Sequence, residues 1–209
     1  MKNRNHILRI VITVFIGLLI IYKTYQFKYS DFVFDGIIYS VIAIIGLIIW
    51  VIILYKDWIL FRKSKQANYL INGIIGGIFL ITVFGINRII NKNFDKPTLL
   101  KVFYDGDYNG TGIDFKTDGT YIFDNFCLGS NYEYGTYEIN GNKITLDKYE
   151  IDNVIKTNQL EIRPKIIEYV DQTKTENYIY QVNEQGEILR NKIEFRIVID
   201  NRIIKSKNE

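Results

Sequence analysis

The sequence predicts a membrane protein with three N-terminal transmembrane α-helices and a C-terminal all-β domain, an antiparallel meander that forms a small barrel or a curved sheet. Residues 1–94 contain three long apolar runs separated by short polar segments. Residues 95–209 instead alternate apolar and polar side chains at the period of a β-strand. The charge divides at the same point. Residues 1–94 carry 11 Lys and Arg against 3 Asp and Glu, whereas residues 95–209 carry 15 against 20.

The apolar runs cover residues 7–25, 34–55 and 69–90, and each approaches or exceeds the roughly 20 residues that a helical crossing of a bilayer requires. The first run has a basic start like that of a signal peptide. It is followed by Lys23 and Thr24 rather than by a small-residue cleavage site, so we expect an uncleaved anchor. No ionisable residue lies near the middle of any run, which argues against a proton relay, an ion pathway or a secondary transporter.

The segment KDWILFRKSKQAN, residues 56–68, places four basic residues around a short apolar run. It is either an interfacial segment on anionic lipid or, as we prefer, an orientation signal under the positive-inside rule. The N-terminal flank and this segment carry seven Lys and Arg, against two after the first run and three after the third. This count predicts that the N-terminus lies inside, and three crossings then place the β domain outside the cytoplasm.

The third run contains Gly73 and Gly77 at the GxxxG spacing that lets two helix backbones approach closely in lipid. We expect these glycines to serve helix packing. The packing partner is either another span of the same subunit, which we prefer, or a second copy of the chain in a homo-oligomer. The lipid bilayer is the first predicted partner of the chain. The Ile, Asn, Lys and Tyr content is typical of AT-rich genes and suggests a bacterial source. Together with the three spans, it predicts a multi-pass protein of the cytoplasmic (inner) membrane of a bacterium.

From about residue 98 onward, seven to nine short strands alternate with turn residues. Asn140-Gly141 gives the clearest hairpin, because both residues accept positive φ. Residues 193–200 alternate strictly between apolar and polar side chains. Closure or strong curvature is expected because an open edge this apolar would invite aggregation. Small barrels commonly have a ligand-sized mouth.

Residue content argues against most catalytic chemistry. His6 is the only histidine and lies at the membrane edge, which excludes Ser-His-Asp and Cys-His catalysis and histidine-containing zinc sites. The single cysteine, Cys127, has no identifiable base near it in the sequence. We therefore expect a small semi-buried residue rather than a nucleophile. Asp105, Asp107 and Asn109 match the first positions of a calcium loop, but the later positions fail, so a polar turn is the preferred interpretation. We expect no enzyme activity and no cofactor.

Binding is the remaining class of function. The β domain is acidic, so a nucleic acid polymer is not an expected partner. A small molecule or a protein is expected instead. The tyrosines of the strands are candidate ligand-binding residues, although half-buried packing explains them more simply. These candidates are Tyr121, Tyr132, Tyr134 and Tyr137.

The stretches GIDFKTDGTYIFDN and YEYGTYEINGNKITLDK resemble the repeated strands of lipocalin-like domains in bacterial envelope proteins. The resemblance implies ligand binding by a barrel. The Gly-x-Trp opening of lipocalins is absent, because no Trp follows Trp58, so no ligand-binding residue is carried over. The overall plan is also similar to the membrane-spanning β-barrel effectors of nucleotide-signalled antiphage defence. This chain departs from them in having three spans rather than two, an acidic domain and the predicted outward orientation.

These observations predict a non-enzymatic integral membrane protein. Its C-terminal β domain binds a ligand or partner and is anchored by, or signals to, the transmembrane helices. Two alternatives stay open. One is a signal-gated, membrane-disrupting effector of antiphage defence, whose β domain binds a nucleotide in the cytoplasm. The other is a toxin-immunity or envelope interaction protein.

Overall fold

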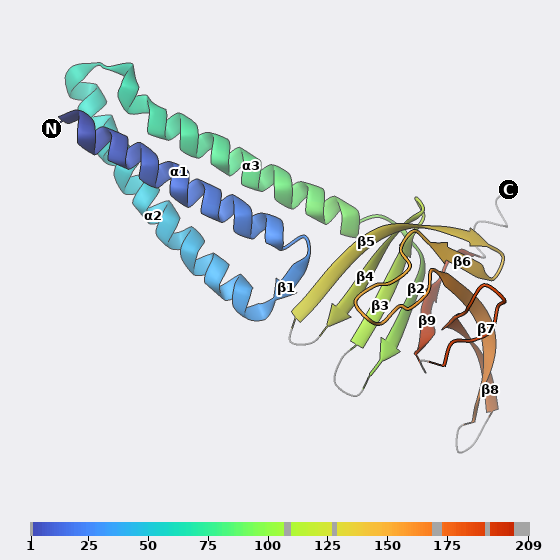
Figure 1. Cartoon of the computed structure of the whole chain (residues 1–209). Helices are drawn as coiled ribbons and strands as arrows, with labels where there is room; N and C mark the ends of the chain where they lie inside the picture. The colour runs from blue at the N-terminus through green and yellow to red at the C-terminus, as the bar shows by residue number, and fades with distance from the viewer. Residues whose placement is uncertain (1, 107–109, 127–128, 169–172, 191–192, 203–209) are drawn as a thin grey trace. The chain divides into compact units, whose positions relative to one another are not determined.

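The computed structural model describes residues 2–106, 110–126, 129–168, 173–190 and 193–202. The chain folds as two units, Met1–Phe94 and Asp95–Glu209. The first unit is helical and the second is built from β-strands (Figure 1).

The first unit consists of three long helices, as the sequence predicts. In chain order its elements are α1 (Lys2–Gln26), the short strand β1 (Ser30–Phe32), α2 (Val33–Ser64), the 3-10 helix η1 (Ala67–Leu70) and α3 (Ile71–Phe94). All three long helices have the length and the apolar composition needed to cross a membrane. Most of their surface is apolar and exposed, as is typical of helices that face lipid.

The inward faces of these helices are unusually small and polar. The residues on these faces recur at intervals of three and four along the chain. This spacing is typical of helices that pack nearly parallel to one another. The buried residues on these faces are His6, Thr13, Gly17 and Thr24 in α1, Gly46, Ile53 and Asp57 in α2, and Asn72, Gly76 and Ile90 in α3. Polar side chains therefore meet between the helices, while apolar side chains face outward.

Helix α2 is longer than the sequence suggested. The predicted second span ended at Tyr55, and residues 56–68 were expected to form a separate flanking segment. The structure continues α2 to Ser64, where Lys65 adopts left-handed φ and its N–H donates to the Phe61 carbonyl at 2.7 Å. The extension forms because Asp57 continues the inward face, buried in line with Ile53 one turn earlier.

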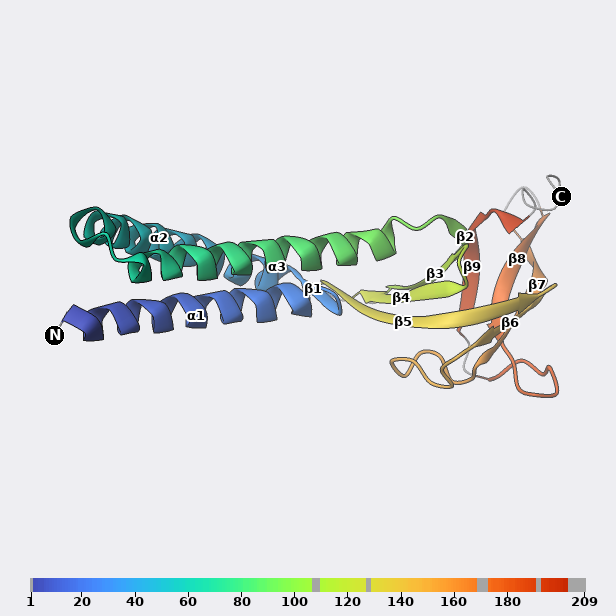
Figure 2. The same ribbon diagram turned by 90° about the horizontal axis from the view of Figure 1, so that it is seen from above.

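The second unit is a ring of eight antiparallel strands. Each strand pairs with the next in the chain, and β9 pairs with β2 to close the ring, for example at Val102 opposite Ile197. Figure 2 shows the ring from a second direction. The strands are β2 (Thr98–Asp105), β3 (Gly110–Lys116), β4 (Thr120–Phe126), β5 (Gly129–Asn140), β6 (Lys143–Leu146), β7 (Gln159–Glu168), β8 (Thr173–Gln181) and β9 (Glu194–Asp200).

The interior of this barrel is filled by large apolar side chains. Phe115, Tyr121, Phe123 and Phe195 are all fully buried and belong to one continuous cluster with inward residues of the other strands. The cluster includes inward side chains from all eight strands of the barrel. These side chains fill the space where they meet, so a ligand-binding site has to be sought where the inward side chains become polar.

Candidate functional site

The barrel interior becomes polar along β4 and β5. Phe123 of β4 is buried in the core and lies opposite Glu133 of β5, so Glu133 is on the interior side of the sheet. By the same alternation, Tyr121 lies opposite Gly135, and Asn125 faces the interior two residues beyond Phe123. Strands β4 and β5 therefore place the Asn125 amide and the Glu133 carboxylate on the interior side of the sheet.

The connection between β6 and β7, residues 147–158, covers these polar side chains. In Figure 1 it is the orange segment that passes in front of β3, β4 and β5. Ile151 and Ile155 anchor it, since both are fully buried in the core cluster. Gln181 also holds it, donating to the Val154 carbonyl at 2.9 Å and accepting from the Lys156 N–H at 2.7 Å.

Polar contacts join this connection to the strands beneath it. Lys148 Nζ pairs with Glu133 Oε2 at 2.8 Å, and Asn125 donates to the Asp152 carboxylate. The Asp147 carboxylate and the Tyr121 hydroxyl both occupy the space that a side chain at Gly135 would fill. We call this set the seam. It consists of Tyr121, Asn125, Glu133, Asp147, Lys148 and Asp152.

The electrostatics of the seam are dominated by three carboxylates and one ammonium group. Burial raises the pKa of Tyr121, and the nearby negative charge of Asp147 raises it further. The Tyr121 hydroxyl is therefore a neutral donor throughout the physiological range. With the carboxylates of Glu133, Asp147 and Asp152 as acceptors, the seam can bind a ligand that carries hydroxyl or ammonium groups.

The tyrosines singled out from the sequence do not form one site. Tyr121 and Tyr137 lie inside the barrel, where the Tyr137 hydroxyl donates to the Lys116 carbonyl at 2.7 Å and burial raises the pKa of Tyr137 to about 12. Tyr132 and Tyr134 are on the opposite face of the sheet, since Tyr134 lies opposite Ile122 and two residues from Tyr132. Of the four, only Tyr121 belongs to the seam.

The candidate calcium residues cannot be compared as a set. Asp105 is exposed at the end of β2, while Asp107 and Asn109 fall outside the described residues, as does Cys127. Among the residues that the structure describes, no three His, Cys, Asp or Glu side chains are grouped so that they could hold a metal ion.

The helical unit contains a second cluster, which the sequence did not reveal. Asp57 is 1% exposed and forms an ion pair with Arg9 of α1. Its other oxygen accepts a hydrogen bond from Asn72 Nδ2 of α3 at 2.6 Å. His6 is buried nearby, its ring 5.2 Å from that of Tyr69 in an edge-to-face arrangement. We call His6, Arg9, Asp57 and Asn72 the polar cluster.

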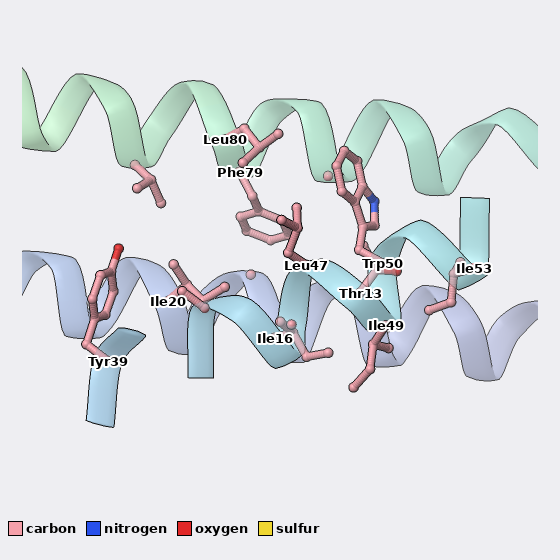
Figure 3. Close-up of a pocket in the computed structure, with 15 residues that line it drawn as sticks. Thr13, Ile16, Ile20, Tyr39, Leu47, Ile49, Trp50, Ile53, Phe79 and Leu80 are labelled. Carbon is pink, nitrogen blue, oxygen red and sulfur yellow. The ribbon is translucent and has the colours of Figure 1, made fainter. Parts of the chain in front are cut away.

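An apolar cavity lies next to the polar cluster between the same three helices. Its volume is about 250 Å³, and its lining includes Ile16, Leu47, Trp50 and Phe79, which are labelled in Figure 3. Trp50 connects the two features, because it lines the cavity and its Nε1 donates to the Asn72 carbonyl at 3.2 Å. We call this space the bundle cavity.

The glycines at which neighbouring helices come closest are Gly17 and Gly76, not the Gly73 and Gly77 chosen from the sequence. A Cβ at Gly73 would stand 3.5 Å from Leu54, and among the described residues no atom lies within 4 Å of where a Cβ at Gly77 would stand. Side chains at Gly17 and Gly76 would overlap Phe79 and Trp50. Packing of a second copy at Gly73 and Gly77 stays a prediction.

The 3.5-residue repeat of small and polar residues in all three helices was the signal that could have located the polar cluster. The seam carries no comparable signal, since it depends on strand register and on a connection without a motif. Comparisons with protein-family models, with curated proteins and with solved structures give no match for this chain.

Proposed function

We propose that this chain is a non-enzymatic, membrane-anchored binding protein whose barrel binds a small hydroxyl- or ammonium-bearing ligand at the seam. The three helices anchor the barrel at a membrane. The observation that supports the proposal most strongly is that a polar connection covers polar, inward-facing side chains of β4 and β5. The Lys148–Glu133 and Asn125–Asp152 contacts of this arrangement are exposed, so a ligand can reach them, and packing of the barrel does not require them.

The polar contacts of the seam are weaker than the apolar contacts that hold the connection over residues 147–158. The seam can therefore open while the barrel stays folded. The Lys148–Glu133 pair is more than one-third exposed on both sides, and such pairs contribute about 0–1 kcal/mol to stability. Ile151 and Ile155 are fully buried and hold the middle of the connection far more strongly, at about 2–5 kcal/mol for each side chain reduced to alanine. A ligand can therefore replace the polar contacts without dislodging these anchors.

The charge distribution supports an outward-facing barrel. The helical unit carries a net charge of +8 and the barrel unit −5. The basic residues concentrate at the N-terminal flank and around the end of α2, which are the same side of the membrane if all three helices cross it. The protein then has its N-terminus inside and presents the seam outside the cytoplasm.

The test is a thermal-shift screen of the full-length protein in detergent, using polyols, sugars, amines and short basic peptides as probes. We expect the compounds that raise the melting temperature to lose their effect in Glu133→Gln and Asp152→Asn. Asp118→Asn is the matched control, because Asp118 is a carboxylate in a turn outside the seam. Shifts that persist in both seam variants would refute binding at the seam.

The signal-gated membrane effector is a second candidate, and the polar cluster favours it. A simple anchor needs no buried ion pair between its helices, whereas a unit that rearranges can use one as a switch. This function requires the barrel to lie in the cytoplasm. It predicts that a cytosolic signal increases membrane permeability in cells that express the chain. The double substitution Arg9→Met with Asp57→Leu, which removes both charges of the pair, is expected to change this response when it is compared at equal expression.

A further inference from the structure

The three carboxylates of the seam lie in a row along β5. Glu133 is one inward position of this strand, and Gly135, the next inward position, has the Asp147 carboxylate beside it. In the other direction, the Asp152 carboxylate accepts from Asn125 of β4, two residues along from the cross-strand partner of Glu133. Inward positions of a strand are about 7 Å apart. The three carboxylates therefore follow one another at about this interval, and we call them the carboxylate row.

The Tyr121 hydroxyl is a buried polar group at one end of the row. Tyr121 is fully buried, and its oxygen lies beside the Asp147 carboxylate in the space that a side chain at Gly135 would fill. Within the described residues, this hydroxyl has no hydrogen-bond partner of ordinary geometry. A buried hydroxyl without a partner is unfavourable, so a group that completes its hydrogen bonding is expected at this end of the row.

Lys148 shows which chemical group the row accepts. Its ammonium group pairs with Glu133, the middle carboxylate, at 2.8 Å. Within the described part of the chain, neither Asp147 nor Asp152 forms an ion pair with a basic side chain. Two of the three carboxylates are therefore left for an external cation, and the third is held by an internal ammonium group that such a cation can replace.

The spacing of the row selects a linear chain of amines among the possible cations. Bond lengths near 1.5 Å place two amines that are joined by four methylene groups about 6 Å apart when the chain is extended. This distance is close to the interval of about 7 Å between inward positions of β5. A metal ion instead needs ligands that converge on one point, and among the described residues no three acidic, His or Cys side chains do so.

We propose that the ligand of the seam is a linear aliphatic polyamine, whose successive ammonium groups pair with Asp147, Glu133 and Asp152. The ammonium group at Asp147 also donates to the Tyr121 hydroxyl oxygen. The middle ammonium group replaces that of Lys148 on Glu133, so Lys148 acts as an internal competitor. This inference rests on the proposed function, because it names the ligand class of the same site.

The test compares amines that differ only in number and spacing of their charges. The probes are butylamine, linear diamines of two to eight carbons, and spermidine, a triamine with linkers of three and four carbons. The dependence of the melting temperature on probe concentration gives the apparent affinity for the full-length protein in detergent. Among the diamines, we expect 1,4-diaminobutane to bind most tightly. Spermidine should bind up to about fivefold more tightly than 1,4-diaminobutane, and butylamine more weakly by a similar factor, because each exposed ion pair contributes about this much.

Lys148→Met and Lys156→Met form a matched pair of variants. Both remove one lysine from residues 147–158, but Lys156 pairs with Glu150 at 2.5 Å, outside the seam. Lys148→Met is expected to raise the apparent affinity for spermidine up to about fivefold, because the internal competitor is gone. Lys156→Met is expected to change it less than about twofold, since the charge it removes lies outside the row.

Two further variants test the end of the row at Asp147. Asp147→Asn is expected to lower the apparent affinity for spermidine to about that for 1,4-diaminobutane, because one ion pair is lost. Tyr121→Phe removes the buried hydroxyl and is expected to weaken spermidine binding while leaving the stability of the free protein unchanged or higher. Circular dichroism and gel filtration establish which variants fold, and one folded variant is sufficient.

The results that would overturn the proposal separate it from the proposed function. Equal affinity for butylamine and all the diamines, with every shift lost in Glu133→Gln, would refute a polyamine while retaining binding at the seam. The same holds if only a sugar, a polyol or a peptide binds there. An equal gain in Lys148→Met and Lys156→Met would show general charge attraction and remove the competing role of Lys148. Shifts by every probe that persist in Glu133→Gln and Asp152→Asn would refute both proposals.

Discussion

Replacing Asp57 tests whether the polar cluster is buried and coupled between the helices. The Asp57→Leu substitution leaves the Arg9 guanidinium without its partner, and Arg9 is only 17% exposed. It also removes the acceptor of the 2.6 Å hydrogen bond from Asn72, which is fully buried. Breaking a buried ion pair from one side costs about 3–5 kcal/mol, because the remaining charge stays buried and unpaired.

The double substitution Arg9→Met with Asp57→Leu removes both charges and is expected to recover most of that loss, since a buried pair and a well-packed apolar replacement are often equal in stability. Equilibrium unfolding in mixed detergent micelles measures the stability of the single variant, the double variant and a control. Asp35→Asn is the control, because its contact with Lys23 at 3.4 Å is long and partly exposed and contributes about 0–1 kcal/mol. A single Asp57 substitution that costs no more than this control would refute the burial of the cluster.

Three further predictions concern packing and charge in each unit. Gly76→Ala is expected to lower stability by about 1–3 kcal/mol through overpacking, whereas Gly77→Ala is expected to be neutral or stabilising; thermal melts compare the two. Hydrogen bonding from Lys96 holds the pKa of Asp118 down at about 2, so its contribution to stability is present above pH 4 and is lost as the pH falls towards 2. Asp118→Asn should remove this part of the acid transition. Ile155→Ala is expected to cost about 2–5 kcal/mol and to increase hydrogen exchange of residues 147–158.

The helices and most strands could be predicted from sequence periodicity. The inward position of Asp57 was not predicted, and the reason is physical. Long apolar runs identify α1, α2 and α3, because lipid-facing helices need apolar surfaces. Asp57 was assigned to a flanking segment because it sits among basic residues. Its inward position becomes visible only when the spacing from Gly46 through Trp50 and Ile53 is followed beyond the apolar run.

The sequence predicted a small antiparallel β domain, but it did not predict which strands pair to close the barrel or which residues form the seam. The hairpin predicted at Asn140-Gly141 is present, but the expectation of positive φ at both residues is wrong. Asn140 pairs with Lys143, so the turn consists of Gly141 and Asn142, and only Gly141 has a positive φ, of +61°. Closure requires β2 to pair with β9, which lies at the other end of the domain, and no local pattern encodes that contact. The seam depends on this register and on residues 147–158, so neither Asp147 nor Asp152 could be selected from the sequence.

Reporter fusions at the C-terminus, directly after Glu209, test the central claim most directly. One reporter is active only in the cytoplasm and the other only outside it. A membrane-anchored binding protein with three crossings and its N-terminus inside predicts activity of the external reporter alone. Activity of the cytoplasmic reporter alone would contradict this account and would make the signal-gated effector the better explanation of the polar cluster.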